Sequence, residues 1–323
     1  MTDFRSPSTP DMMAPRYTEI ATFLRTPLAQ SLNEVDIGLV GIPYDGALTN
    51  RPGARHGPRE VRNQSSLTRA INHATLVNPF ELARIADVGD VHFSSVFNIE
   101  DTHREITDFI AMLVANGVMP IAVGGDHSVS LPILRALAHE PVAMIHIDAH
   151  TDTWDQFQGS KFNHGAPFRR AVEEGLIDPK KTIQIGIRGA QNVPEGWDYS
   201  RKSGMRVVFI EEFVKSGVAA IAAEARALVG DSPVYLTFDI DSLDPVYAPG
   251  TGTPEIGGIT TIQAQELLRS LRGLNYIGAD LVEVSPPFDV GNITALTGAT
   301  VLYEIACSLA ETIAAARSKP AAG

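Results

Sequence analysis

The chain has 323 residues, of which 44% are hydrophobic and 20% are charged, the proportions of an ordinary globular protein. Its formal net charge of −12 gives no support to a nucleic-acid-binding face, and no stretch approaches the ~18 consecutive apolar residues of a membrane span. The single cysteine, Cys307, excludes an internal disulfide and fits a reducing compartment. We therefore expect a cytoplasmic globular protein that binds neither nucleic acid nor membrane.

Short apolar runs alternate with segments of helical spacing along most of the chain. In chain order, the predicted elements are strands at 35–42 and 83–88, a helix at 101–115, a strand at 119–123, a helix at 128–138, strands at 142–147, 182–187 and 207–210, a helix at 218–228, a strand at 234–240, a helix at 261–271, a strand at 276–284 and a helix at 294–315. This alternation predicts an α/β fold in which a mostly parallel sheet lies between two layers of helices. Because no repeat or linker divides the chain, we expect one domain at 16–317, a flexible N-terminal arm at 1–15 and a frayed tail at 318–323.

Acidic and histidine residues follow two of the predicted strands. Asp148, His150 and Asp152 are spaced two apart, and Asp239 and Asp241 repeat that spacing later in the chain. In extended backbone, residues two apart share one face, and ligands of parallel sheets bind beyond the carboxyl ends of the strands. If the two strands lie close together, four carboxylates meet, and two divalent cations would balance their charge. The spacing therefore predicts a dinuclear metal site.

His127 follows another predicted strand and adds a second imidazole to this set. Oxygen ligands with two imidazoles favour manganese or a neighbouring first-row metal over a structural zinc site. Among the nearby polar residues, we expect Asp126 to hydrogen-bond a histidine ligand, His146 to be structural, and Asp244 to shape its loop.

Six motifs are spread over much of the chain. They are Gly124-Gly125-Asp126-His127-Ser128, Asp148-Ala149-His150-Thr151-Asp152, Asn163-His164-Gly165, Phe238-Asp239-Ile240-Asp241-Ser242-Leu243-Asp244-Pro245, Ala248-Pro249-Gly250-Thr251-Gly252-Thr253-Pro254-Glu255 and Glu283-Val284-Ser285-Pro286-Pro287. In this combination, they resemble the ureohydrolase family of arginases, agmatinases and guanidino-acid hydrolases.

The resemblance implies an arginase-like fold, a hydrolase that releases urea from a small guanidino compound, and a pair of manganese ions that activate water. It implies one metal held by His127, Asp148, Asp152 and Asp239, and the other by Asp148, His150, Asp239 and Asp241. His164 corresponds to a histidine of a mobile loop and is predicted to bind substrate and carry a proton. Glu283 corresponds to the glutamate that holds the guanidinium. With Asp148, these two residues form the predicted catalytic set.

The substrate is left open between several guanidino compounds. Arginases carry an asparagine just after the Asp-x-His-x-Asp motif, whereas this chain has Trp154, which disfavours arginine. We expect Trp154 and Asn163 to contribute to binding of agmatine, guanidinobutyrate or guanidinopropionate. Arg51, Arg55 or Arg59 would be available to meet a substrate carboxylate.

Three other interpretations remain. A nickel-dependent enzyme would act on an unusual guanidine or biguanide. A non-catalytic partner subunit of an active homologue is disfavoured because every ligand position is intact. Another dinuclear hydrolase, such as a phosphoesterase, is disfavoured because no glycine-rich phosphate cradle is evident. The resemblance also implies a homo-oligomer, either a trimer or a hexamer.

Overall fold

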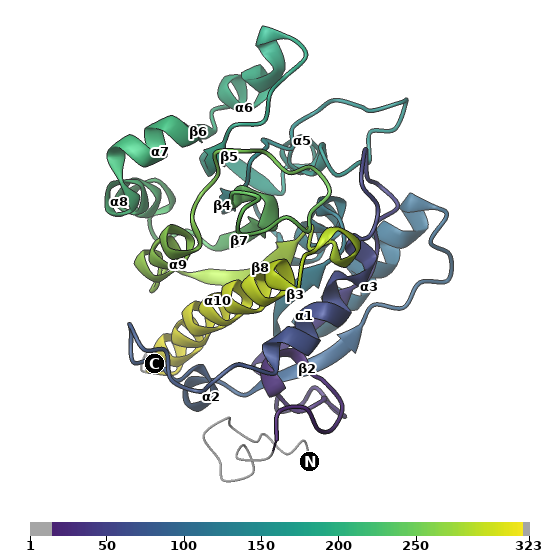
Figure 1. The fold of residues 1–323 in the computed structure, drawn as a ribbon, viewed down its shortest axis with the longest axis vertical. Coiled ribbons are helices and arrows are strands. Elements are labelled where there is room, and N and C mark those ends of the chain that lie inside the picture. Colours follow the sequence, from purple (N-terminus) through teal and green to yellow (C-terminus); the bar gives the residue numbers. More distant parts are fainter. Residues whose placement is uncertain (1–14, 319–323) are drawn as a thin grey trace.

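The computed structural model describes residues 15–318, in which a single sheet lies between two layers of helices (Figure 1). The arm expected at 1–15 and the tail expected at 318–323 fall outside the described residues, except for their innermost positions. The innermost position of the tail, Ser318, is the last residue of the final helix.

Every strand pair within residues 15–318 is parallel, and the strand order is β2-β1-β3-β8-β7-β4-β5-β6. The strands are β1 Ile37–Ile42, β2 Ile85–Asp90, β3 Met119–Gly124, β4 Val142–Ile147, β5 Ile177–Ile187, β6 Arg206–Phe209, β7 Val234–Asp239 and β8 Tyr276–Val282. All the predicted strands are present, and the predicted α/β class is confirmed. The sheet was expected to be mostly parallel and is parallel throughout the described chain.

The helices that cover the sheet vary greatly in length. They are α1 Gly57–Ser65, α2 Pro79–Leu82, α3 Ile99–Ala115, α4 Ser130–Leu137, α5 Pro167–Glu173, α6 Asp198–Ser203, α7 Ile210–Ser216, α8 Val218–Val229, α9 Thr261–Ser270 and α10 Ile293–Ser318. The five predicted helices correspond to α3, α4, α8, α9 and α10. The helix expected from 128 begins instead at Ser130, because a 3₁₀ turn, His127–Val129, precedes it.

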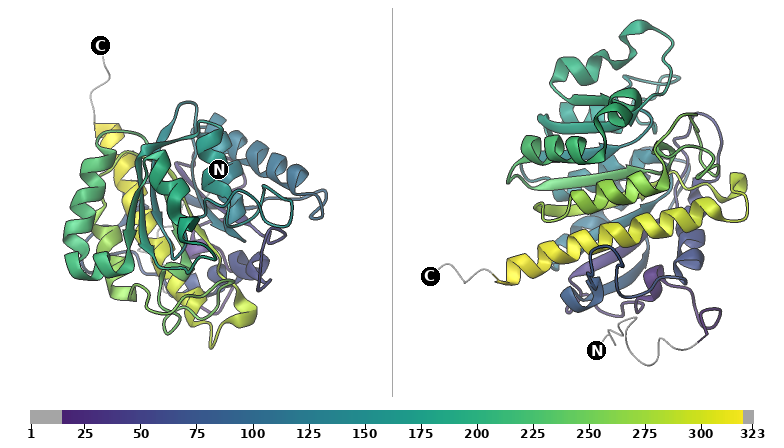
Figure 2. Two further views of the ribbon diagram at one scale, coloured as in Figure 1. Left: turned by 90° about the horizontal axis from the view of Figure 1, so that it is seen from above. Right: turned by 60° about the vertical axis from the view of Figure 1, so that its left-hand side comes forward.

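Alternate residues of the strands contribute their side chains to two separate apolar cores, one on each face of the sheet. Ile37 and Leu39 of β1 face one core, whereas Val40 and Ile42 face the other. Helices α1, α8, α9 and α10 cover the first face, and α3, α4 and α5 cover the second (Figure 2). Because both faces are covered, the strands β1 and β3 carry no polar side chains, as is common for parallel strands.

The helix α10 is long and apolar enough to cross a membrane by length and composition alone. However, 78% of its most apolar stretch is buried inside the protein, and Cys307 on this helix is 1% exposed. The apolar faces of α10 therefore belong to the core.

Candidate metal centre

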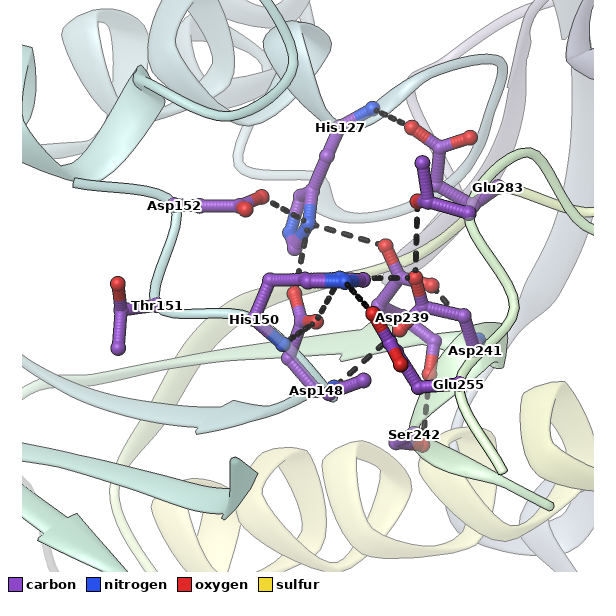
Figure 3. Close-up of polar contacts among 12 residues, drawn as sticks. His127, Asp148, His150, Thr151, Asp152, Asp239, Asp241, Ser242, Glu255 and Glu283 are labelled. Carbon is purple, nitrogen blue, oxygen red and sulfur yellow. Dashed lines mark hydrogen bonds and ion pairs between the residues drawn. The ribbon is translucent and has the colours of Figure 1, made fainter. Parts of the chain in front are cut away.

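Four neighbouring strands deliver the polar residues of the site to one edge of the sheet. In the order β3-β8-β7-β4, their carboxyl ends lead into His127, Glu283, Asp239 and Asp148. The strands β7 and β4 are direct neighbours, although β5 and β6 lie between them in sequence. The adjacency on which the predicted carboxylate cluster depended is therefore present (Figure 3).

The Nδ1 atom of His127 faces three carboxylates. It lies 3.1 Å from Asp148 Oδ2, 2.9 Å from Asp152 Oδ2 and 3.2 Å from Asp239 Oδ2. None of these contacts has the geometry of a hydrogen bond, and Nδ1 is buried without a partner. The other ring nitrogen, Nε2, is 2.8 Å from Thr237 Oγ1. A buried imidazole nitrogen ringed by carboxylate oxygens suits a bound cation.

A second group of ligand atoms surrounds His150. Its Nδ1 atom lies 3.1 Å from Asp241 Oδ2 and 3.5 Å from Asp148 Oδ1. Its Nε2 atom faces Glu255 Oε1 at 3.6 Å. Because Asp148 faces both histidines, the two groups of ligand atoms share this carboxylate.

The electrostatics show that this cluster lacks positive charge. Burial, followed by the Asp241 and Asp148 carboxylates, raises the pKa of Asp239 well above its usual range. Burial alone would lower the pKa of His127, but the surrounding Asp148, Asp152 and Asp239 carboxylates outweigh it and raise that pKa well above its ordinary value. In the absence of other cations, the cluster would therefore hold protons, and divalent metal ions can take their place.

The ligand atoms fall into two overlapping sets whose members lie within 4.8 Å of one another. The first contains His127, His146, Asp148 and Asp152, and the second contains Asp148, His150 and Asp241. Asp239 belongs to neither set, but its Oδ2 atom reaches His127 and its Oδ1 atom accepts a hydrogen bond of 2.7 Å from Asp241 N. The residues present therefore fit two cations. The six predicted ligands lie together, and His146, expected to be structural, lies beside them.

Glu283 and His164 form a buried pair beside the cluster. Glu283 Oε1 accepts hydrogen bonds from His127 N and from His164 Nδ1, both at 2.9 Å, while Oε2 is buried without a partner. His164 Nε2 lies 2.7 Å from Thr49 Oγ1. Burial would lower the pKa of His164, but the charge of Glu283 outweighs it and raises the pKa to about 9.

Two residues of the site adopt left-handed backbone, which is uncommon outside glycine. Asp152 has φ of 51° and Glu283 has φ of 64°. Such conformations cluster at functional sites, where the surrounding structure maintains them. Here each one turns a carboxylate toward the same cluster (Figure 3).

A cavity of about 370 Å³ opens over the cluster. Its lining includes Arg51, Trp154, His164 and Glu255. Of the three arginines considered for a substrate carboxylate, only Arg51 lines it. Arg55 is paired with Asp45, and Arg59 is exposed on α1.

The Asn163 side chain, predicted to contribute to substrate binding, is hydrogen-bonded within its own loop. It accepts a hydrogen bond from Gly165 N at 3.0 Å and donates one to Ser160 O at 3.2 Å, so it shapes the loop rather than lining the cavity. Glu255, by contrast, belongs to one of the six motifs, but nothing in the sequence indicated a role for it. Its contact with His150 across two distant segments had no signal in the sequence.

The expectation that Asp126 hydrogen-bonds a histidine ligand is wrong. Its carboxylate accepts from Ala47 N and from the amide and hydroxyl groups of Ser128, so it caps the turn that carries His127. The prediction that Asp244 shapes its loop is confirmed, because its carboxylate accepts hydrogen bonds from three amides of that loop.

Comparisons with known proteins agree with this site. The model of the arginase family matches residues 35–308. The chain is 53% identical to a guanidinopropionase from Pseudomonas aeruginosa, a match that covers 93% of this chain and 95% of that protein. It is 47% identical to a guanidinobutyrase from the same organism, covering 91% and 94%. Among solved structures, proclavaminate amidinohydrolase from Streptomyces clavuligerus superposes with a TM-score of 0.89 at 38% identity, covering 93% of this chain and all of that chain.

Proposed function

This chain belongs to the arginase family, and from that premise we propose that it hydrolyses a short guanidino acid to urea and an amino acid. The family match, the relatives and the metal-ligand cluster identify the protein as a ureohydrolase of guanidino compounds. The acid at the far end of the substrate is the proposed part. Two of its relatives bear the names guanidinopropionase and guanidinobutyrase, which supports this choice.

The proposal depends on the position of Arg51 in the cavity wall and on the groups that surround its guanidinium. It lines the cavity above the metal cluster and lies over the ring of Phe288, 5.2 Å from its centroid. In the described part of the chain, no carboxylate lies within 4.0 Å of its guanidinium. An arginine at a cavity wall without an acidic partner can bind a substrate carboxylate through two parallel hydrogen bonds. The ammonium of agmatine would meet a like charge there.

We propose manganese as the bound metal, since the donors are carboxylate oxygens and imidazole nitrogens without thiolates. Nickel is the alternative, because it accepts the same imidazoles. When bound, such ions lower the pKa of water toward neutrality and so supply a nucleophile. Metal analysis of the purified protein distinguishes the two elements.

The side chains around the cluster have separate roles in this scheme. Glu283 has an unpaired, buried Oε2 atom, which accepts a guanidinium N–H and holds the electrophilic carbon beside the metal ligands. Water adds to that carbon, and the bond to the substituted nitrogen breaks. The leaving nitrogen then needs a proton. Because its raised pKa keeps it protonated near neutral pH, His164 is able to supply one.

The test is urea release from guanidinopropionate, guanidinobutyrate, agmatine and arginine by the manganese-loaded protein. We expect a guanidino acid to have the highest kcat/KM. Arg51→Met should reduce that value by about 10- to 150-fold, the equivalent of the ~1.5–3 kcal/mol of a charged hydrogen bond. Activity toward agmatine should not fall.

Arg59→Met is the matched control, because Arg59 is exposed and lies outside the cavity lining. Preference for agmatine, or an equal loss on both substrates in Arg51→Met, would contradict the guanidino-acid proposal. Urea from none of the four would favour a non-catalytic subunit.

We further propose that the chain acts as a cytoplasmic homo-oligomer, as the family resemblance implies. Exposed apolar side chains support an oligomer, since Val246, Ile262 and Val290 are each more than 70% exposed near the ends of α9 and α10. Light scattering on the purified protein measures the assembly, and cell fractionation tests the compartment.

A further inference from the structure

A row of buried polar side chains crosses the sheet beneath the metal centre. Asp280, Thr237, His146 and Gln184 are register partners on β8, β7, β4 and β5, and each is 0% exposed. Buried polar groups at adjacent positions in a sheet are costly unless they bond to one another or to a neighbour. Two members contact predicted metal ligands, since Thr237 meets His127 and His146 meets Asp148.

The orientation of the Gln184 amide is set by its surroundings. Its Nε2 atom donates to the carbonyl oxygen of Thr151 at 2.7 Å and lies 3.0 Å from His146 Nδ1. A flipped amide would place its oxygen against that carbonyl oxygen, and two acceptors repel. The nitrogen therefore faces both partners and has one hydrogen for each.

This amide determines the tautomer of His146. Because Gln184 donates to Nδ1, that nitrogen is an acceptor, and the ring proton resides on Nε2. Nε2 then donates to Asp148 Oδ2 at 2.7 Å. Phe168 packs against the imidazole with ring centroids 4.5 Å apart, which fixes the plane of the ring.

Hydrogen bonds from two different residues hold both oxygens of Asp148 in place. Oδ2 accepts from His146, and Oδ1 accepts from His150 N at 2.6 Å. Each carboxylate oxygen has a further lone pair available for a metal ion. His146 has none left, since one of its nitrogens accepts from Gln184 and the other carries the proton.

We propose that Gln184 and His146 are positioning residues that orient Asp148 as the ligand shared by two metal ions, and that His146 is not itself a ligand. This inference rests on the proposed two-metal centre but not on the substrate. Removing partners that orient a metal ligand typically costs about 10- to 100-fold in metal affinity.

The experiment titrates chelator-stripped full-length protein with Mn²⁺ and no substrate, measuring the affinity and the number of ions bound. His146→Phe removes the donor and keeps a flat ring, and His146→Gln restores an N–H near the position of Nε2. Gln184→Met removes the amide at similar volume. Tyr235→Phe is the matched control, since it removes a buried hydroxyl bonded to Asp280 in the same sheet without touching a metal ligand.

We expect His146→Phe and Gln184→Met to bind two ions with affinity reduced about 10- to 100-fold. His146→Gln should recover most of the loss, and Tyr235→Phe should match the unmodified protein. Affinity within twofold of the unmodified protein in both weakened variants would overturn the positioning role. A single ion at saturation in His146→Phe would make His146 a ligand instead.

If His146→Phe does not fold, His146→Gln and Gln184→Met decide between these outcomes. In that case, an unchanged affinity in Gln184→Met, or a single ion bound by His146→Gln, overturns the proposal. Failure of the unmodified protein to bind Mn²⁺ would instead refute the proposed metal, which keeps the two failures distinguishable.

Discussion

Replacing His103 should remove a defined part of the protein's acid sensitivity. His103 lies on α3 and is 2% exposed, and neither of its ring nitrogens has a hydrogen-bond partner. Its ring packs edge-on against Phe162, with centroids 5.5 Å apart. Burial, followed by the charge of Arg135, lowers the pKa of His103 from 6.5 to about 3. The folded protein therefore holds this histidine in its neutral form.

The sign and size of the effect follow from this lowered pKa. Because the folded-state pKa lies below the unfolded value, the stabilising contribution is complete above about pH 6.5 and is lost as the pH falls toward 3. Each pH unit between those values costs about 1.4 kcal/mol, so the step from about pH 7 to about pH 5 removes roughly 2 kcal/mol of the free energy of unfolding.

Denaturant unfolding of metal-free protein in the presence of a chelator measures this difference. His103→Leu has a similar volume and no titratable group, so it should lose roughly 2 kcal/mol less than the unmodified protein over the same pH step. The exposed His139 supplies the control His139→Leu, which should retain the full loss. Parallel pH dependence in His103→Leu and the unmodified protein would refute the assignment of acid sensitivity to this buried ring.

Three further changes test the site and its support. Asp239→Asn removes a carboxylate that faces His127, so elemental analysis should find fewer than two manganese ions per chain. Urea release should fall by more than about 100-fold, the upper range for losing a residue that only supports a metal ligand. His164→Gln should lower kcat by about 10²- to 10⁴-fold, while bound metal and KM change little, and an unchanged kcat would exclude it as the proton donor. Gly125→Ala would place a Cβ 1.5 Å from the carbonyl oxygen of Tyr44, so a loss above about 4 kcal/mol in chemical unfolding is expected. Gly159→Ala would meet nothing within 4 Å and should cost only the about 1–2 kcal/mol of left-handed backbone at its φ of 84°.

The strands were predictable because both faces of the sheet are covered. A strand buried on both sides reads as a nearly continuous apolar run, as 119–123 does, and as 142–147 does apart from His146. Five helices were missed because none exceeds nine residues, which leaves too few turns for an apolar stripe to stand out. In α5, for example, Phe168 and Ala171 are the only buried nonpolar side chains apart from the initial proline.

The ligand residues were predictable from spacing, but their assembly was not. The spacing argument assumed extended backbone, but β4 ends at Ile147 and Asp152 has φ of 51°, so a turn rather than strand alternation brings Asp148 and Asp152 together. That β7 lies directly beside β4 depends on the crossover connections of the whole chain. The failure at Asp126 has the same origin, because a short polar side chain bonds to whichever amide its loop brings within reach, as that of Asn163 also does.

The charges of the residues around the cavity link the metal centre to the choice of substrate. The four clustered carboxylates balance two divalent cations, and Glu255 faces His150. Glu283 pairs with His164 through Oε1 and leaves Oε2 for a guanidinium. Arg51 is then the charge without a counterpart among the residues that the structure describes. A guanidino acid brings one positive group for Glu283 and one negative group for Arg51, whereas agmatine brings two positive groups. The sequence alone offered three candidate arginines, and the selection of one of them required the fold.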